Sequence, residues 1–94
     1  MKIFQSSSFA RKIKKLQKNQ KKDLDNAIKE IIATPHIGTE KKGDLKGIYR
    51  YKIKIQKTQY LLSYRFLGDD LELITLGPHE NYYRDLKSYL RTQE

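Results

Sequence analysis

The sequence predicts an α+β domain in which an N-terminal helix hairpin packs on a small antiparallel sheet, with the element order β-α-α-β-β-β-α. The chain has 94 residues, which suits a single domain spanning residues 1–94. Apolar residues recur at helical spacing in the first third of the chain and alternate with polar residues after residue 48. Helices followed by a run of strands are typical of the α+β class.

The N-terminal third predicts a short strand and two helices. Ile3 and Phe4 form the apolar run of the strand, and one of the serines at 6–8 can cap the next helix. Apolar residues at positions 9, 13 and 16 have helical spacing, and 19–20 mark a weak break. A second, strongly amphipathic stripe follows, made of Leu24, Ala27, Ile28, Ile31 and Ile32. Thr34-Pro35 ends this helix, because the residue before proline disfavours helix.

The remaining elements are a loop, three strands and a last helix. Residues 35–47 predict a loop, because they combine three glycines with a charge cluster. Residues 48–55 and 60–67 alternate as half-buried strands, with a turn at 56–59. Gly68-Asp69-Asp70 signals a hairpin turn, and residues 71–76 are apolar enough on both faces to form a central strand. Gly77-Pro78 ends that strand, and residues 80–90 predict the helix.

Composition limits the classes of function. The formal net charge is +9, which favours a polyanionic partner: nucleic acid, an anionic membrane surface or an acidic protein. The alternative is a lysine-rich surface that serves solubility alone. Residues 1–47 hold 12 basic and 5 acidic groups, so most of the excess lies in the helical half. The chain contains no cysteine, which excludes disulfides and thiolate sites, and its two histidines are too few for a protein-only zinc site.

No apolar segment has the length of a membrane helix, and the N-terminus lacks the apolar core of a secretory signal. We therefore expect a cytoplasmic protein.

A row of cations on the strand at 48–55 is the first candidate site. Arg50, Lys52 and Lys54 alternate with apolar residues and so point to one face. Strand residues two apart lie about 6–7 Å apart on one face, which matches successive phosphates of a nucleic-acid strand. Three like charges in a row also predict a nearby counter-charge. The alternative is an ordinary solvated face of an antiparallel sheet.

A histidine and two tyrosines after the last strand form the second candidate site. His79 follows the strand end, and histidine is the side chain best matched to proton transfer near neutral pH. Tyr82 and Tyr83 offer faces for base stacking, and Arg84 offers a phosphate fork. Alternatively, His79 caps a loop and Tyr83 packs in the core. His36, beside Pro35, is expected to be a structural or surface residue.

The order and spacing of three motifs resemble the RelE/ParE toxin superfamily. They are Tyr51-Lys52-Ile53-Lys54-Ile55, Tyr60-Leu61-Leu62-Ser63-Tyr64, and Leu76-Gly77-Pro78-His79-Glu80 with Tyr83-Arg84. Each motif is weak alone, but with the helix hairpin the resemblance covers nearly the whole chain. It implies a RelE-like fold and a toxin of a type II toxin–antitoxin pair, with an antitoxin protein as partner.

RelE-like toxins are messenger RNA endoribonucleases that act at the ribosome without a metal or cofactor. By that resemblance Lys52 and Lys54 match the phosphate-holding lysines, His79 matches the late basic residue, and Tyr83 matches the late tyrosine. Arg50, Arg65, Arg84 and Tyr82 are candidates for RNA binding. Leu61 departs from the pattern, because RelE-like toxins carry an arginine there; Arg65 on the same strand face is the candidate replacement.

Two further hypotheses stay open at this stage. ParE-like relatives share the scaffold but poison DNA gyrase, and such a toxin would have no RNase site. The third hypothesis is a non-toxic protein that binds RNA or the ribosome.

Overall fold

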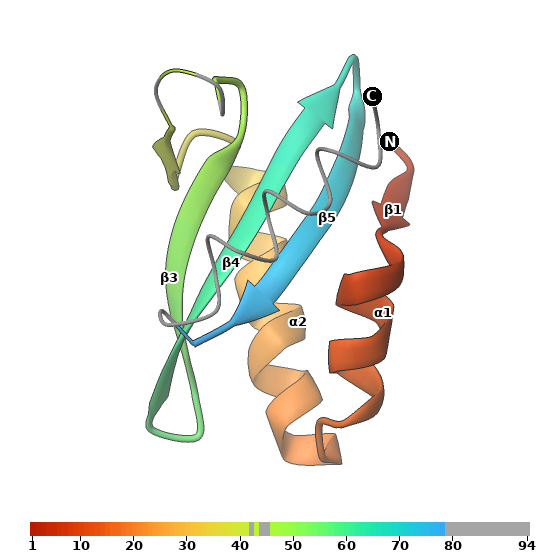
Figure 1. Cartoon of the computed structure of the whole chain (residues 1–94), viewed down its shortest axis with the longest axis vertical. Helices are drawn as coiled ribbons and strands as arrows, with labels where there is room; N and C mark the ends of the chain where they lie inside the picture. Colours follow the sequence, from red (N-terminus) through yellow and green to blue (C-terminus); the bar gives the residue numbers. More distant parts are fainter. Residues whose placement is uncertain (42, 44–45, 79–94) are drawn as a thin grey trace.

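The computed structural model describes residues 1–41, 43 and 46–78. Within these ranges the chain forms two helices and five strands, which confirms the α+β class (Figure 1). In chain order they are β1 (Ile3–Gln5), α1 (Ser7–Lys14), α2 (Lys18–Ala33), β2 (Thr39–Glu40), β3 (Tyr49–Ile55), β4 (Thr58–Leu67) and β5 (Asp70–Gly77). The helix expected at 80–90 lies outside the described residues.

The sheet has the strand order β1-β5-β4-β3-β2 and is mixed, where the sequence led us to expect an antiparallel one. β2 to β5 pair antiparallel, as strands joined by short connections do. β1 pairs parallel with β5, with Ile3 opposite Leu71. These two strands are separated by most of the chain, so no local turn determines their relative direction. The two-residue strand β2 lies within the predicted loop.

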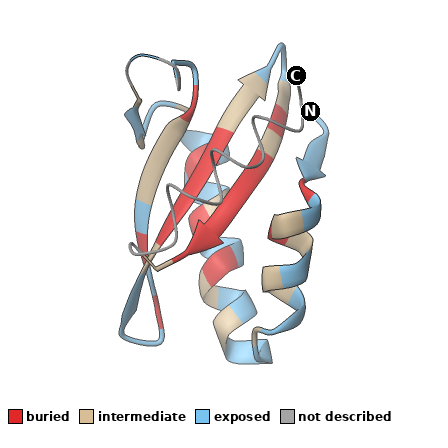
Figure 2. Ribbon diagram, viewed as in Figure 1, coloured by how far each residue is buried: buried red, intermediate tan, exposed pale blue. Residues whose placement is uncertain are grey.

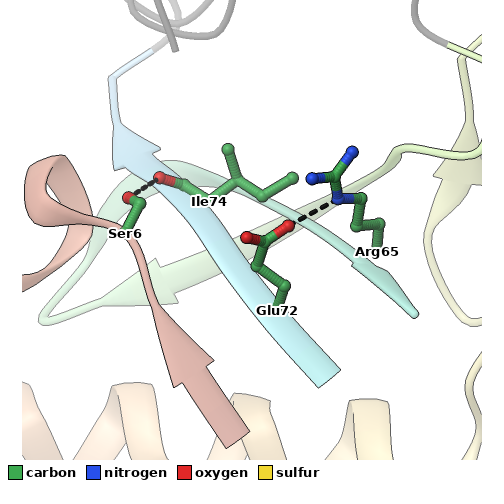
Figure 3. A network of polar contacts seen from close by, with 4 residues as sticks. All are labelled: Ser6, Arg65, Glu72 and Ile74. Carbon is green, nitrogen blue, oxygen red and sulfur yellow. Dashed lines mark hydrogen bonds and ion pairs between the residues drawn. The ribbon is translucent and has the colours of Figure 1, made fainter. Parts of the chain in front are cut away.

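The corner between β1 and α1 is fixed by Ser6. Its Oγ accepts a hydrogen bond from the backbone N–H of Phe9 at 3.0 Å and so caps the helix. The same hydroxyl donates to the carbonyl oxygen of Ile74 in β5 at 2.5 Å (Figure 3). Ser6 is buried, so both bonds replace lost contacts with water. This single side chain therefore starts α1 and ties it to β5.

Both helices lie on one face of the sheet, with α1 against β5 and α2 against β3 (Figure 1). The core between helices and sheet contains Phe9 of α1, Leu24, Ala27 and Ile31 of α2, and Ile53, Ile55, Leu62, Tyr64, Leu71, Leu73 and Leu76 of the strands. Figure 2 shows the buried residues running along β4 and β5. The central position predicted for the strand at 71–76 is thus confirmed. No helix in the described ranges is long and apolar enough to cross a membrane.

The hairpin between β3 and β4 turns on only two residues. Gln56 and Lys57 have φ of 50° and 73°, and Ile55 pairs with Thr58. Two consecutive positive φ angles are typical of the turns that match the twist of a tight hairpin. Asp23 of α2 accepts hydrogen bonds from the backbone N–H and the side-chain Nε2 of Gln56, at 3.0 and 3.2 Å. The turn is therefore anchored to α2 although neither residue is a glycine.

Replacing Lys57 by glycine is expected to stabilise the fold. A non-glycine residue in the left-handed region is strained by about 1–2 kcal/mol, and the extra freedom of an unfolded glycine offsets part of the gain. We expect the free energy of unfolding to rise by about 0.5–1 kcal/mol, in line with the glycine preference at this turn position. Urea denaturation of Lys57→Gly and of Lys57→Ala measures it. A Lys57→Ala variant as stable as Lys57→Gly would contradict the backbone explanation.

Candidate nucleic-acid interface

The exposed cations of β3 alternate with residues that face the core. Ile53 and Ile55 face the core, so Lys52 and Lys54 lie on the opposite face, which we call the cation face. Both lysines are exposed, and within the described part of the chain neither has an ion-pair partner. Arg50 lies on the same face, is half-buried and is engaged in a polar interaction. Lys52 and Lys54 are therefore the two cations of the row available to an anionic ligand.

Strand pairing brings the end of β5 into the same row as Lys52. Lys52 pairs with Leu61, and Leu61 pairs with Gly77, so all three lie side by side on the cation face. Neighbouring strands are about 4.8 Å apart, which separates the backbone at Lys52 from that at Gly77 by about 10 Å. Leu61 and Gly77 are buried and Lys52 is exposed. The chain thus leaves β5 about 10 Å from the backbone of Lys52, a distance that two side chains extending toward each other can span.

The second candidate segment lies almost entirely beyond this point. His79, Tyr82, Tyr83 and Arg84 fall outside the described residues, which end at Pro78. β5 is the strand that leads to His79, and its last residue, Gly77, lies in the row of Lys52 on the cation face.

The counter-charge expected beside the lysine row lies on α2. A hollow of about 310 Å³ separates α2 from β3 and is lined by Asp23, Asn26, Ala27, Glu30, Tyr51, Lys52, Ile53 and Lys54. Asp23 already binds the turn at Gln56, and Glu30 accepts a hydrogen bond from the hydroxyl of Tyr51. Two carboxylates therefore line the same hollow as the lysines without forming an ion pair with them. Neither Asp23 nor Glu30 was among the residues predicted to belong to the site. Their separation of seven residues, which puts both on one helix face, is the feature of the sequence that points to them.

Arg65 lies on the cation face but is held by a carboxylate. Its Nε–H donates to Glu72 Oε1 at 2.5 Å, and the two residues are directly opposite each other on β4 and β5 (Figure 3). The two side chains are 25% and 14% exposed, so the pair is partly shielded from water. Arg65 lies four residues beyond Leu61 on β4, away from the row of Lys52 and Gly77. The structure thus gives Arg65 a partner that sequence reasoning did not foresee.

Tyr51 ties the edge strand β3 to α2. The hydrogen bond to the Glu30 carboxylate, reinforced by burial, raises the pKa of Tyr51 to about 12. The neutral hydroxyl is therefore favoured in the folded protein, whereas an unfolded tyrosine ionises near pH 10. The contribution of this group to stability is complete below pH 10 and is lost as the pH rises from 10 to about 12.

A Tyr51→Phe variant is expected to lose less stability than the wild type across this alkaline window. Phenylalanine cannot ionise, so the part of the pH dependence that comes from Tyr51 disappears. A Glu30→Gln variant should show an intermediate slope, because the Glu30 carboxylate is the main cause of the raised pKa. Denaturant midpoints at pH 9 to 12 measure both. Identical slopes for the wild type and Tyr51→Phe would show that the hydrogen bond does not persist in solution.

An aromatic cluster holds the loop before β2 on the sheet. Tyr64 is fully buried, and its hydroxyl donates to the carbonyl oxygen of Pro35 at 2.8 Å and accepts from the N–H of Gly38 at 3.0 Å. Burial raises the pKa of Tyr64, which keeps the hydroxyl protonated. The ring stacks on Tyr49, whose hydroxyl shares a 2.8 Å hydrogen bond with His36 Nδ1. His36 therefore takes part in loop packing, as expected for a structural residue.

Chemically, the described part of the interface can bind anions. In the described ranges, no group of three or more histidine, aspartate or glutamate side chains is placed to hold a metal ion. Two exposed ammonium groups at phosphate spacing, beside the end of a buried strand, are suited to a sugar–phosphate backbone.

The model of a protein family, the ParE-like toxins of type II bacterial toxin–antitoxin systems, matches residues 3–87. The chain belongs to this family. The RelE/ParE resemblance inferred from three short motifs is thereby confirmed. No curated protein matches the toxin.

Three solved structures share the fold of this toxin. A variant of E. coli RelE with two arginines replaced by alanine, in the free state, has a TM-score of 0.69 at 18% identity, and covers 93% of this chain and 95% of that chain. The intact E. coli RelBE toxin–antitoxin complex gives 0.64 at 20% identity, with coverages of 81% and 93%. The isolated E. coli RelE toxin gives 0.63 at 21% identity, with coverages of 93% and 96%. The RelE-like fold is thus confirmed.

Proposed function

We propose that this toxin is an endoribonuclease that cuts messenger RNA at the ribosome, in the cytoplasm. The observation that supports the proposal best is the strand pairing that places Lys52, Leu61 and Gly77 side by side across β3, β4 and β5. Two ammonium groups at phosphate spacing, which have no ion-pair partner among the described residues, adjoin the strand that leads to His79, so cations and a proton-transfer group can serve one phosphodiester. The similarity to RelE structures supports the same scaffold for this chemistry.

The proposed reaction uses the nucleophile that RNA itself carries. The 2′-hydroxyl gives its proton to a base and attacks the neighbouring phosphorus, the bond from phosphorus to the 5′-oxygen breaks, and the 5′-oxygen takes a proton from an acid. Lys52 and Lys54 stabilise the negative charge that gathers on the phosphate oxygens, a role that a metal ion has in other nucleases. His79 acts as general acid or base. The products are a 2′,3′-cyclic phosphate and a 5′-hydroxyl.

The other candidate residues have supporting roles in this proposal. Tyr83 orients the substrate or stacks on a base, and Tyr82 and Arg84 extend the contact with RNA. Arg50 and Arg65 support the phosphate site from the cation face. Because Glu72 holds the Nε of Arg65, the terminal amino groups of that guanidinium are the part that can reach RNA.

An antitoxin is the proposed protein partner. A type II toxin needs one, and the E. coli RelBE complex shares this fold. With a net charge of +9, the toxin suits an acidic segment that folds over its basic surface. Inhibition of DNA gyrase, favoured by the ParE-like family description, is the second candidate function.

Induction of the toxin without an antitoxin tests the proposal through three readouts: growth, mRNA integrity and DNA damage signalling. We expect growth arrest with cleaved mRNA and no early DNA damage response. Arrest with intact mRNA and a DNA damage response would overturn the RNase proposal in favour of gyrase inhibition. Normal growth and intact mRNA would contradict both.

A further inference from the structure

One side of α1 carries a row of cations that the proposed catalytic site does not use. Ser8, Arg11, Lys12 and Lys15 have the spacing of a single helix face, distinct from the face that buries Phe9. We call these four residues the α1 stripe. They surround a hollow of about 430 Å³, lined by Ser8, Arg11, Lys12, Lys14 and Lys15. Residues 6–22 contain seven lysines and arginines and no acidic residue. Among the described residues, the lining of the hollow therefore consists of cationic side chains and one hydroxyl.

Lys12 connects this stripe to the end of β5. Its ammonium lies 3.9 Å from the point where a Cβ on Gly77 would stand. Gly77 is in the row of Lys52, and its strand pairing places Lys52 on its far side. Lys12 is half-buried, and among the described residues its ammonium has no ion-pair partner. The end of β5 is thus flanked by Lys52 of the sheet and Lys12 of the helix.

We propose that the α1 stripe binds the phosphates of the RNA strand that extends beyond the cleaved bond. This inference rests on RNA being the substrate, as proposed above, and adds the path that the strand takes: from the β3 lysines, past the end of β5, to α1. Leu61 and Gly77 are buried, so neither contacts the strand, and its next contacts beyond the β3 lysines are at Lys12. Arg11 and Lys15 are exposed and continue the path, and the Ser8 hydroxyl can donate to a phosphate oxygen.

The chemistry of the stripe favours a polynucleotide over a protein partner. Protein interfaces depend on a buried centre of aromatic or aliphatic anchors. Among the described residues the large hydrophobic side chains that are exposed are Met1, Ile3, Phe4, Ile32, Ile37 and Leu67, and none belongs to α1. A phosphate backbone needs only cations and polar donors, which the stripe supplies.

Binding of RNA oligonucleotides of two lengths tests this inference. The probes are 2′-O-methyl RNAs of 4 and 12 nucleotides, which the proposed reaction cannot cut, and fluorescence anisotropy is read at several salt concentrations. Lys12→Gln, Arg11→Gln and Lys15→Gln are each expected to weaken binding of the 12-mer about fivefold at 0.1 M salt, because each lost phosphate contact removes about 0.7 from the salt slope of a single strand. Affinity for the 4-mer, which occupies the β3 lysines, should stay the same.

Lys29→Gln is the matched control, because it removes one exposed lysine of α2 outside the stripe. We expect this variant to bind both oligonucleotides as the wild type does. If the three stripe variants behave like Lys29→Gln while the wild type binds RNA, the α1 inference is wrong and the proposed RNase function stands. If an oligoglutamate of matched charge displaces the 12-mer as well as RNA does, the stripe is a general acidic-ligand surface and the inference is also wrong. If the wild type binds neither oligonucleotide, the RNA proposal itself fails.

Discussion

Replacing Lys52 by alanine is expected to lower the rate of mRNA cleavage about 100- to 1,000-fold, the usual cost of removing one group that stabilises transition-state charge. Lys52 is exposed and has no ion-pair partner in the described ranges, so the loss should come without a change in stability. His79→Ala should have an effect of about 100- to 10,000-fold, which is typical of a general acid or base. Cleavage of mRNA on translating ribosomes, measured under single-turnover conditions, gives both values.

Lys29→Ala serves as the control for Lys52→Ala, because it removes the same charge from the exposed surface of α2. A uniform electrostatic effect would slow Lys29→Ala and Lys52→Ala alike. In that case, the lysine row would act only by attracting RNA to the protein, and its assignment to the chemical step would be wrong.

The largest expected effect on stability comes from Tyr64. Tyr64→Ala should reduce the free energy of unfolding by about 3–5 kcal/mol, the range for truncating a buried aromatic side chain. The ring is fully buried and packs against Tyr49 and Phe66. Tyr64→Phe keeps the ring but leaves the Gly38 N–H and the Pro35 carbonyl without their partner, which should cost about 1–3 kcal/mol. Urea denaturation measures both.

Tyr60→Phe is the control for the hydroxyl. Tyr60 lies on the same strand face but is partly exposed and makes no hydrogen bond through its hydroxyl in the described structure. Loss of the Tyr60 hydroxyl should change the free energy of unfolding by less than about 0.5 kcal/mol. Equal effects of Tyr60→Phe and Tyr64→Phe would mean that the loop before β2 is not held through the Tyr64 hydroxyl.

Local patterns predicted most of the fold correctly. The apolar stripe of α2, with Leu24 and Ile31, is buried as its spacing indicates. Alternation in β3 placed Lys52 and Lys54 on one solvent-facing side, and the structure confirms it. Such patterns repeat within a few residues, so the sequence displays them directly.

Features that depend on distant parts of the chain were not predictable in this way. The parallel pairing of β1 with β5 joins residues more than sixty positions apart, and no turn motif encodes it. The ion pair of Arg65 with Glu72 joins residues that are near in sequence, but it depends on the register of the β4–β5 hairpin, in which Leu67 pairs with Asp70. Lys12 lies beside Gly77 only because α1 packs on β5. The pairing of β1 with β5 and the approach of Lys12 to Gly77 follow from tertiary packing, which periodicity does not encode.

Analysis of the cleaved RNA ends tests the proposed chemistry most directly. Purified toxin would be added to ribosomes translating a defined mRNA, and the new termini would be identified by mass spectrometry. Attack by the 2′-hydroxyl predicts fragments with a 2′,3′-cyclic phosphate on one side and a 5′-hydroxyl on the other, and none of these fragments in the same time with Lys52→Ala. Fragments with 3′-hydroxyl and 5′-phosphate ends, or equal yields from the wild type and Lys52→Ala, would contradict it.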